Sequence, residues 1–248
     1  MKTKIVAVIN QKGGTGKTTT TINLGSALSK QGHKVLLLDL DPQSNLSYSL
    51  AVSSPDQTLA EAFVGAKSLK EILVEKDGLW VAPGSNELVD VEISLVTQPE
   101  RESFLKSMLS QVKGFDYVLI DCPPSLSVLT LNALTAAHEV LIPLQMEVLT
   151  LQGLDQIMNT IEKVKKAFNP KLKIKGIVVV MFDVRRKLSL EVLDYLRENV
   201  QEKIFDSHIR LNVKLAEAPS FGKSILDYDS TSNGAKDYKA LAAEFSLA

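Results

Sequence analysis

A glycine-rich stretch near the start of the sequence reads Asn10-Gln11-Lys12-Gly13-Gly14-Thr15-Gly16-Lys17-Thr18-Thr19. It follows a β-branched run at residues 4–10 and leads directly into a helical pattern at residues 17–31. Between a strand and a helix, such a loop points backbone N–H groups inward, and the helix dipole adds a positive potential. Lys17 adds a charge, and Thr18 offers a hydroxyl to Mg²⁺. The stretch therefore predicts a phosphate-binding loop at the first strand–helix junction.

The loop departs from the common phosphate-binding motif at one position. That motif has a glycine five residues before Gly16, where this chain has Gln11. The alternative interpretation is a plain glycine-rich turn without a ligand. The flanking strand and helix, together with the other matching positions, favour the phosphate-binding interpretation.

Short β-branched runs alternate with helical patterns along the rest of the chain, which is typical of βαβ units. We expect strands at residues 4–10, 34–39, 79–83, 116–121, 139–145, 174–182 and 204–209. We expect helices at residues 17–31, 95–112, 126–136, 149–168, 188–200 and 235–245, and a short helix at 59–64. The sequence therefore predicts an α/β fold in which residues 1–248 form a single domain. Its sheet is expected to be doubly wound and mostly parallel, with helices on both faces.

Composition narrows the class of protein. The chain has 248 residues, 28 Lys+Arg against 29 Asp+Glu and a net charge of −1, which argues against coating of nucleic acid through bulk positive charge. Cys122 is the only cysteine, so we expect a reducing, cytoplasmic environment and a small buried side chain rather than a nucleophile. No apolar run reaches the roughly 18 residues of a membrane-spanning helix, and no signal-peptide pattern is present.

Four segments of the chain carry a family resemblance. The stretch from Lys12 to Thr19 resembles the deviant Walker A loop of the ParA/MinD ATPases, in which an extra signature lysine, here Lys12, precedes the glycines. Two further segments match in order and spacing: Asp39-Leu40-Asp41-Pro42-Gln43 and Tyr117-Val118-Leu119-Ile120-Asp121-Cys122-Pro123-Pro124-Ser125. The fourth is similar to a loop of the ParA/Soj branch and reads Leu215-Ala216-Glu217-Ala218-Pro219-Ser220-Phe221-Gly222-Lys223. The resemblance covers nearly the whole chain and implies a P-loop ATPase that uses ATP and Mg²⁺.

The residues of these segments suit phosphoryl transfer to water, which requires a positioned water and neutralised phosphate charge. Lys17 and a Mg²⁺ ion near Thr18 are expected to neutralise that charge. Asp41, just after the second strand, is expected to orient or deprotonate the attacking water, and the resemblance identifies it as the catalytic aspartate. Asp39 and Asp121, at strand ends, are expected to hold Mg²⁺ through its waters. For Asp39, a purely structural role at the strand end is an equally good alternative.

The roles of Lys12 and of the base contacts follow from the resemblance. Lys12 is implied to reach across a face-to-face homodimer to the partner's ATP and to act in catalysis with Lys17 and Asp41; the plain alternative is that it only raises the local positive potential. The family commonly has Ile-Pro-Arg-Asn-Val where this chain has Ile209-Arg210-Leu211-Asn212-Val213, so Arg210 replaces the proline that helps to frame the adenine. The expected nucleotide-binding residues are Lys12, Gly13, Gly14, Thr15, Gly16, Lys17, Thr18, Thr19, Met181, Arg210 and Asn212.

DNA binding would have to come from a local basic patch. Val184-Arg185-Arg186-Lys187 follows the strand expected at residues 174–182, and Lys214 precedes the Glu217-Ala218-Pro219 loop. The resemblance implies that Arg185 and Lys214 take part in nonspecific binding of double-stranded DNA by the ATP-bound dimer, and we add Arg186 to that set. A solvated basic loop is the alternative. The lysines of residues 163–175 are expected to form a solvated face, with accessory DNA contact as the second possibility.

Several functions remain open within the resemblance. Residues 234–248 mix charges of both signs and resemble a packing helix rather than the basic amphipathic helix of the membrane-binding MinD branch, so we expect no stable membrane association. The iron–sulfur relatives need two cysteines per subunit and are excluded.

The favoured function is partitioning of a chromosome or plasmid on the nucleoid with a ParB-like centromere-binding protein. The alternatives are positioning of a protein cargo such as a chemoreceptor cluster or microcompartment, a MinD-like membrane positioning ATPase, and a nucleotide-dependent regulator whose hydrolysis is incidental.

Overall fold

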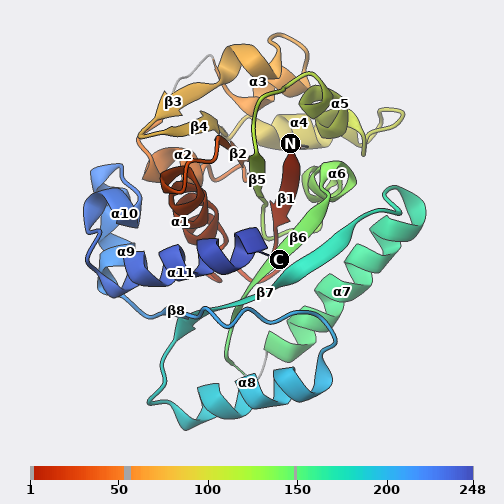
Figure 1. The fold of residues 1–248 in the computed structure, drawn as a ribbon. Helices are drawn as coiled ribbons and strands as arrows, with labels where there is room; N and C mark the ends of the chain where they lie inside the picture. The colour runs from red at the N-terminus through yellow and green to blue at the C-terminus, as the bar shows by residue number, and fades with distance from the viewer. Residues whose placement is uncertain (1–2, 53–56, 148–149, 248) are drawn as a thin grey trace.

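An eight-stranded sheet organises the described part of the chain (Figure 1). The structure, a computed structural model, describes residues 3–52, 57–147 and 150–247. The strand order is β3-β4-β2-β5-β1-β6-β7-β8, and each neighbouring pair is parallel except β3 and β4. The strands are β1 (Lys4–Val8), β2 (Val35–Asp39), β3 (Val74–Lys76), β4 (Leu79–Ala82), β5 (Tyr117–Asp121), β6 (Glu139–Gln145), β7 (Lys173–Phe182) and β8 (Ile209–Arg210). This topology confirms the predicted doubly wound, mostly parallel α/β fold.

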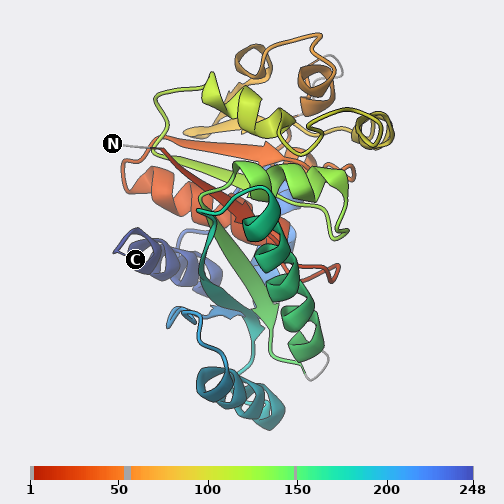
Figure 2. The same cartoon turned by 90° about the vertical axis from the view of Figure 1, so that its right-hand side faces the viewer.

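Helices cover both faces of the sheet. The helices α1 and α11 pack together on one face, and α6 and α7 lie on the other, in front of the sheet in Figure 2. The helices are α1 (Lys17–Lys30), α2 (Asn45–Ser49), α3 (Leu59–Phe63), α4 (Leu88–Leu95), α5 (Phe104–Ser110), α6 (Val128–Ala136), α7 (Thr150–Ala167), α8 (Lys187–Asn199), α9 (Val213–Glu217), α10 (Ile225–Tyr228) and α11 (Asn233–Leu247), with the 3₁₀ helices η1 (Leu69–Ile72) and η2 (Ala218–Phe221). Within the described residues, no helix combines the length and the apolar character needed to cross a bilayer.

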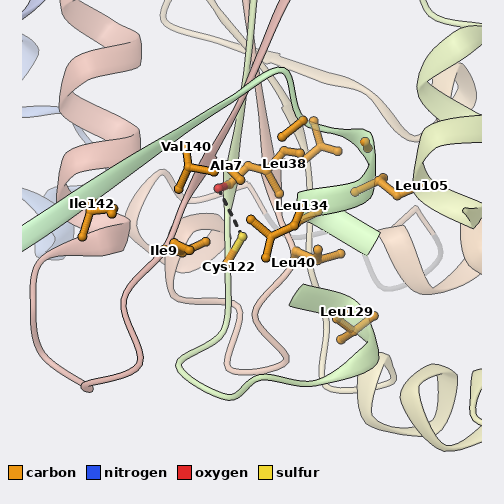
Figure 3. Close-up of a cluster of buried hydrophobic side chains, with 14 of the residues drawn as sticks. Ala7, Ile9, Leu38, Leu40, Leu105, Cys122, Leu129, Leu134, Val140 and Ile142 are labelled. Atoms are coloured by element: carbon orange, nitrogen blue, oxygen red, sulfur yellow. Dashed lines mark hydrogen bonds between the residues drawn. The ribbon is translucent and has the colours of Figure 1, made fainter. Parts of the chain in front are cut away.

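Two clusters of buried apolar side chains fill the space between the sheet and the helices. Successive strand residues point to opposite faces, so Ala7 and Ile9 join the cluster beneath α3–α8, whereas Val6 and Val8 join the cluster beneath α1, α10 and α11. Figure 3 shows the first cluster around Cys122. Cys122 is fully buried, and burial raises the pKa of its thiol well above the ordinary value. It is a packing residue, as the sequence predicts.

The helix expected at residues 95–112 is wrong. Instead, α4 ends at Leu95 and α5 begins at Phe104, with turns between them. Pro99 lacks the N–H that a helix interior needs, and Glu100 has a φ of 51°, which lies outside the right-handed helical region. The expected helix overlaps α5 but extends back through the turns of residues 96–103, and α4, which precedes it, was not predicted. Pro99 was the signal against a continuous helix.

The strand expected at residues 204–209 is also wrong in extent. Ile204 forms only an isolated bridge, to Ile177, and β8 begins at Ile209. The reason is a competing acceptor, because the backbone N–H groups of Asp206 and Ser207 donate to the Glu244 carboxylate of α11 at 3.1 and 3.0 Å. Those N–H groups are therefore unavailable to a strand ladder.

Strand β3 was not predicted from the sequence. It pairs antiparallel with β4 across Asp77 and Gly78, both at positive φ (51° and 80°). An Asp-Gly dipeptide between two short strands is a strong hairpin signal, because it tolerates two consecutive left-handed residues. Other expected boundaries shift by one or two residues: β1 ends at Val8, β7 starts at Lys173, α6 starts at Val128 and α11 starts at Asn233, for example. Leu149, the expected first residue of α7, lies outside the described residues.

Candidate nucleotide and magnesium site

The glycine-rich loop connects β1 to α1 at the carboxyl edge of the sheet. Gly14 and Gly16 both have a φ of 74°, in the left-handed region that a side chain disfavours, and Gly16 is the N-cap residue of α1. Gly13 has no positive φ, so its backbone conformation does not demand glycine. The loop thus presents the N-terminal N–H groups of α1 to the crevice, as a phosphate site requires.

Asn10 holds this loop in shape. Its Nδ2 donates to the carbonyl of Pro143 on β6 at 2.7 Å, and its Oδ1 accepts from the N–H of Lys12 at 3.0 Å. The Thr15 hydroxyl closes the turn by donating to the Lys12 carbonyl at 3.1 Å. The sequence placed Asn10 in the motif without assigning it a role, because its partner lies 133 residues away. These bonds organise the loop within the chain itself.

Lys17 lies inside the crevice. It is 7% exposed, and burial lowers its pKa, while the nearby carboxylates of Asp121 and Asp41 act in the opposite direction. Its Nζ reaches the Lys12 carbonyl only at 3.5 Å, a long hydrogen bond. A buried ammonium so weakly bonded is well suited to meet a phosphate group.

Asp39 and Asp121 lie side by side at the ends of β2 and β5, where they are register partners. Both are fully buried. Burial is the main cause that raises the pKa of Asp121 well above its ordinary value, and the negative charge of Asp39 is the second cause. Burial also raises the pKa of Asp39 to about 6. Neither oxygen of Asp121 has a hydrogen-bond partner within normal distance, although the Thr18 hydroxyl is close enough to lower its pKa. Two adjacent buried carboxylates of this kind call for a cation.

The carboxylates of Asp39 and Asp121 differ in the number of hydrogen bonds that they accept. Oδ2 of Asp39 accepts from the backbone N–H and the hydroxyl of Ser47 at 2.8 and 2.6 Å, while its Oδ1 has no partner. One oxygen therefore has a structural role and the other is buried without a partner, so a magnesium role of Asp39 remains a prediction. No group of three or more His, Cys, Asp or Glu among the described residues could hold a metal ion. Oxygen donors in small number suit Mg²⁺, which keeps several waters.

Asp41 lies in the turn after β2. It is 7% exposed, its Oδ1 accepts from the N–H of Gln43 at 3.0 Å, and its carbonyl accepts from the N–H of Ser44 at 2.8 Å. Its negative charge acts on Lys17, which places the carboxylate beside the phosphate loop. This turn fixes Asp41 at the edge of the crevice, where the sequence predicts it.

The three predicted base contacts lie together at a cavity of about 150 Å³ beside the phosphate loop. Its lining includes Gly16, Thr19, Met181, Arg210 and Asn212. Met181 projects there because β7 bulges: Val180 pairs with Ile209 and Phe182 with Arg210, which leaves Met181 between them at a φ of 52°. Strained backbone of this kind is concentrated at ligand sites. Contact with a base remains a prediction.

Lys12 is paired within its own chain. Its half-exposed Nζ contacts Oε2 of Glu147, just after β6, at 2.7 Å. Glu147 was not singled out from the sequence, since 135 residues separate the two. A contact between Lys12 and a second subunit would compete with this pair.

The predicted DNA contacts lie beyond the carboxyl ends of the neighbouring strands β7 and β8. Arg185 is 84% exposed, and its Nε and Nη2 both contact the Asp183 carboxylate at 2.9 Å. The hydrogen bonds from Arg185 lower the pKa of Asp183 to about 2. Lys214 contacts Glu217 at 2.8 Å, and Arg186 is exposed. The acidic partners, which the sequence pattern did not reveal, leave the patch only partly positive.

The lysines of residues 163–175 are not all solvated. Lys175 is only 6% exposed; it lies 3.5 Å from Glu139 and over the ring of Phe245. The expectation of a solvated face is wrong for this residue, because α11 covers it. Lys163, Lys166, Lys171 and Lys173 are exposed, as expected.

Comparisons with known proteins agree with this site. A family described as AAA domain matches residues 3–174. The chain is 44% identical over 248 residues to the chromosome partitioning protein ParA of Caulobacter vibrioides, covering 97% of this chain and 93% of that protein. It is 43% identical over 246 residues to the sporulation initiation inhibitor protein Soj of Bacillus subtilis, covering 97% of each. Cobyrinic acid a,c-diamide synthase from Mycobacterium smegmatis, solved with an ATP analogue and magnesium, has a TM-score of 0.86 at 36% identity and covers 98% of this chain and 93% of that one.

The fold and the site define a P-loop ATPase: a parallel sheet, a glycine-rich loop at the first strand–helix junction and carboxylates at the neighbouring strand ends. Identity above 40% along nearly the full chain then narrows the class. The chain belongs to the ParA/Soj family of chromosome-partitioning ATPases. The resemblance read from the four sequence segments is confirmed.

Proposed function

We propose that the protein is a Mg²⁺-dependent ATPase that forms a dimer with ATP and, as that dimer, binds DNA without sequence preference. In this proposal it partitions a chromosome or plasmid on the nucleoid, in the cytoplasm, with a ParB-like partner. One observation carries the enzymatic part: the unbonded carboxylate oxygens of Asp39 and Asp121 beside Thr18 and Lys17. The names of the relatives support the partitioning role.

The phosphate groups are bound by the loop and by Lys17. Backbone N–H groups at the start of α1 and the Lys17 ammonium stabilise the negative charge that builds on the phosphate oxygens. Asp39, Asp121 and Thr18 would hold Mg²⁺, which would neutralise further phosphate charge. Because these groups already lie in the crevice, little reorganisation is required for catalysis.

Asp41 orients the attacking water. Its carboxylate is held by the N–H of Gln43 and lies beside Lys17, so one oxygen remains to accept a hydrogen bond from water. A positioned carboxylate at this place lowers the entropic cost of bringing water to the terminal phosphate. Lys12 completes the site of a second copy of the chain after it leaves Glu147.

The packing of α11 argues against the membrane alternative. Ala235, Tyr238, Leu241 and Phe245 are buried against α1 and the sheet, and Leu247 at the end of the helix is the large apolar side chain that α11 exposes among its described residues. A membrane-binding helix would need to present such residues to lipid. The function that we propose therefore uses DNA rather than a bilayer as its surface.

A titration of double-stranded DNA against the protein in ATP, ADP and no nucleotide, with phosphate release measured in parallel, tests the proposal. We expect DNA binding chiefly in ATP, and phosphate release that requires Mg²⁺. Equal binding in all three nucleotide states would contradict the nucleotide switch. Absence of phosphate release with every DNA and partner tried would contradict the ATPase.

Arg185→Ala and Asp183→Asn are expected to change DNA affinity in opposite directions. Loss of Arg185 removes one phosphate contact from each subunit, so the ATP-bound dimer should bind about 5-fold more weakly, and its salt dependence should fall by about two units of slope. Asp183→Asn keeps the oxygen that accepts the Arg185 N–H but removes the competing charge, so binding should tighten by about 3-fold. Fluorescence anisotropy at several salt concentrations measures both effects.

The matched control is Lys106→Ala, which removes an exposed charge on α5. It should leave affinity and salt slope within 2-fold of the wild type, since α5 packs against α3 and α6, away from the carboxyl ends of β7 and β8. Unchanged binding by Arg185→Ala would show that the basic loop is only a solvated one, the alternative that its composition left open.

A further inference from the structure

Arg210 is fixed rigidly at the rim of the base cavity. Its Nε contacts both oxygens of Asp237, at 3.1 and 3.0 Å, and its Nη2 contacts Oδ1 at 2.5 Å. Its backbone N–H also donates to Oδ2 at 3.0 Å, a bond that a proline at this position could not make. Asp237 is nearly buried on α11, whereas the Arg210 side chain is 45% exposed. The carboxylate therefore takes one edge of the guanidinium and leaves part of the group open.

Arg210 is also part of the cavity wall. Arg210 lines the cavity together with Met181, Asn212 and apolar side chains from β7 and β8. A guanidinium is planar and weakly hydrated, and its face stacks well on aromatic rings and on nucleic-acid bases. An edge-on bond to a carboxylate preserves that face while removing the rotational freedom of the side chain.

We propose that the guanidinium of Arg210 is the stacking surface for the purine base of the bound nucleotide, and that Asp237 is a positioning residue that holds it in plane. The inference rests on the proposed nucleotide site and adds to it how the base is bound. The Oδ1 of Asn212 already accepts from the Lys214 N–H at 2.8 Å as an N-cap, so one of its two lone pairs is engaged and its amide NH₂ remains for a ligand. In this proposal, stacking on Arg210 supplies most of the base affinity.

The same helix ties the base wall to the phosphate loop. Tyr238, next to Asp237, is 1% exposed, and its hydroxyl lies 3.2 Å from the Thr20 hydroxyl in the first turn of α1. Tyr238 also lines the cavity. Two consecutive residues of α11 thus connect Arg210 to α1, the helix that begins at Lys17. This connection fixes the spacing between the phosphate loop and the stacking surface.

Paired binding measurements with Mg·ATP and with Mg·tripolyphosphate, which has no base, test the assignment. Arg210→Ala should bind ATP about 10-fold more weakly and tripolyphosphate within 2-fold of the wild type, because stacking contributes about 1–3 kcal/mol per base. Arg210→Lys should bind ATP as weakly as Arg210→Ala, since lysine keeps the charge and loses the plane. Asp237→Asn, which does not touch the nucleotide, should weaken ATP binding by about 3-fold and leave tripolyphosphate binding unchanged.

The outcomes separate this inference from the proposed function. Wild-type affinity for ATP in Arg210→Ala, or full rescue by Arg210→Lys, would overturn the stacking role. An equal loss of both ligands in Arg210→Ala would assign the residue to folding of the site and would also overturn it. Failure of the wild-type protein to bind either ligand would instead overturn the phosphate site on which the inference rests.

Discussion

Replacement of Asp41 by alanine is expected to reduce ATP turnover by about 100-fold or more while leaving ATP binding intact. The reason is that a positioned carboxylate acts on the attacking water, and such groups contribute about 10²–10⁴-fold to rate. The phosphate loop, Lys17 and the paired carboxylates Asp39 and Asp121 are untouched, so the nucleotide should still bind with Mg²⁺. The variant should therefore accumulate as an ATP-bound dimer on DNA. Single-turnover phosphate release and DNA retention after a salt wash measure the two effects.

Asp41→Asn is the matched variant for this experiment. Asparagine keeps the oxygen that accepts the Gln43 N–H, so the turn after β2 should be preserved. It cannot accept a proton at neutral pH, so turnover should fall nearly as far as in the alanine variant. Normal turnover in both variants would contradict the assignment of Asp41 and would favour a nucleotide-dependent regulator. Weak ATP binding in Asp41→Asn would place Asp41 in ground-state binding rather than in water activation.

The phosphate site was predictable because its residues are close in sequence or lie at the ends of parallel strands. The loop from Lys12 to Thr18 occupies one strand–helix junction, where spacing alone fixes the geometry. Asp39 and Asp121 are far apart in the sequence, but parallel strands share a carboxyl edge, and the structure pairs the two residues directly. The alternation of strands and helices was enough to predict this proximity, since a parallel sheet leaves few other positions for residues at strand ends.

Long-range contacts set the limit of sequence-based prediction. The bulge that aims Met181 at the cavity depends on an offset between Val180 and Phe182 in the pairing with β8, and no local pattern records it. Glu147, the partner of Lys12, comes just after β6 and belongs to no sequence motif. The strand expected at residues 204–209 failed for the same reason, because a carboxylate on α11 removed two of its N–H donors.

Several basic side chains at the carboxyl edge of the sheet form ion pairs with a nearby carboxylate, which the amino-acid composition could not reveal. Lys12 pairs with Glu147, Arg185 with Asp183, and Lys214 with Glu217. Exposed pairs of this kind contribute little to stability because solvent screens them, so a stronger anion can displace the carboxylate. A single subunit with a net charge of −1 is therefore expected to bind polyanions such as DNA weakly, although its basic side chains are already in position. Nucleotide-driven pairing of two subunits would then raise that affinity by bringing two weak patches together.

Replacement of Lys12 by alanine is expected to abolish the ATP-dependent dimer at micromolar protein, because each subunit then lacks its contact to the partner's nucleotide. Two such contacts are lost per dimer, and a charge-assisted bond contributes about 1.5–3 kcal/mol, so the dimer dissociation constant should rise by about 100-fold or more. The measurement is sedimentation velocity with a nonhydrolysable ATP analogue. Lys106→Ala, which removes an exposed lysine of α5, should dimerise like the wild type.

Glu147→Gln distinguishes the contact between subunits from a general effect of positive charge. In the free chain Lys12 is held by Glu147 at 2.7 Å, so the proposed contact to a partner's nucleotide would compete with this pair. Removing the Glu147 charge should lower the ATP analogue concentration needed for dimerisation by about 2- to 5-fold, the range expected for an exposed ion pair. If Lys12 served only to raise the local potential, Lys12→Ala would weaken nucleotide binding to the monomer and leave the dimer constant at saturating nucleotide unchanged. A normal dimer in Lys12→Ala would therefore contradict the role proposed for the signature lysine.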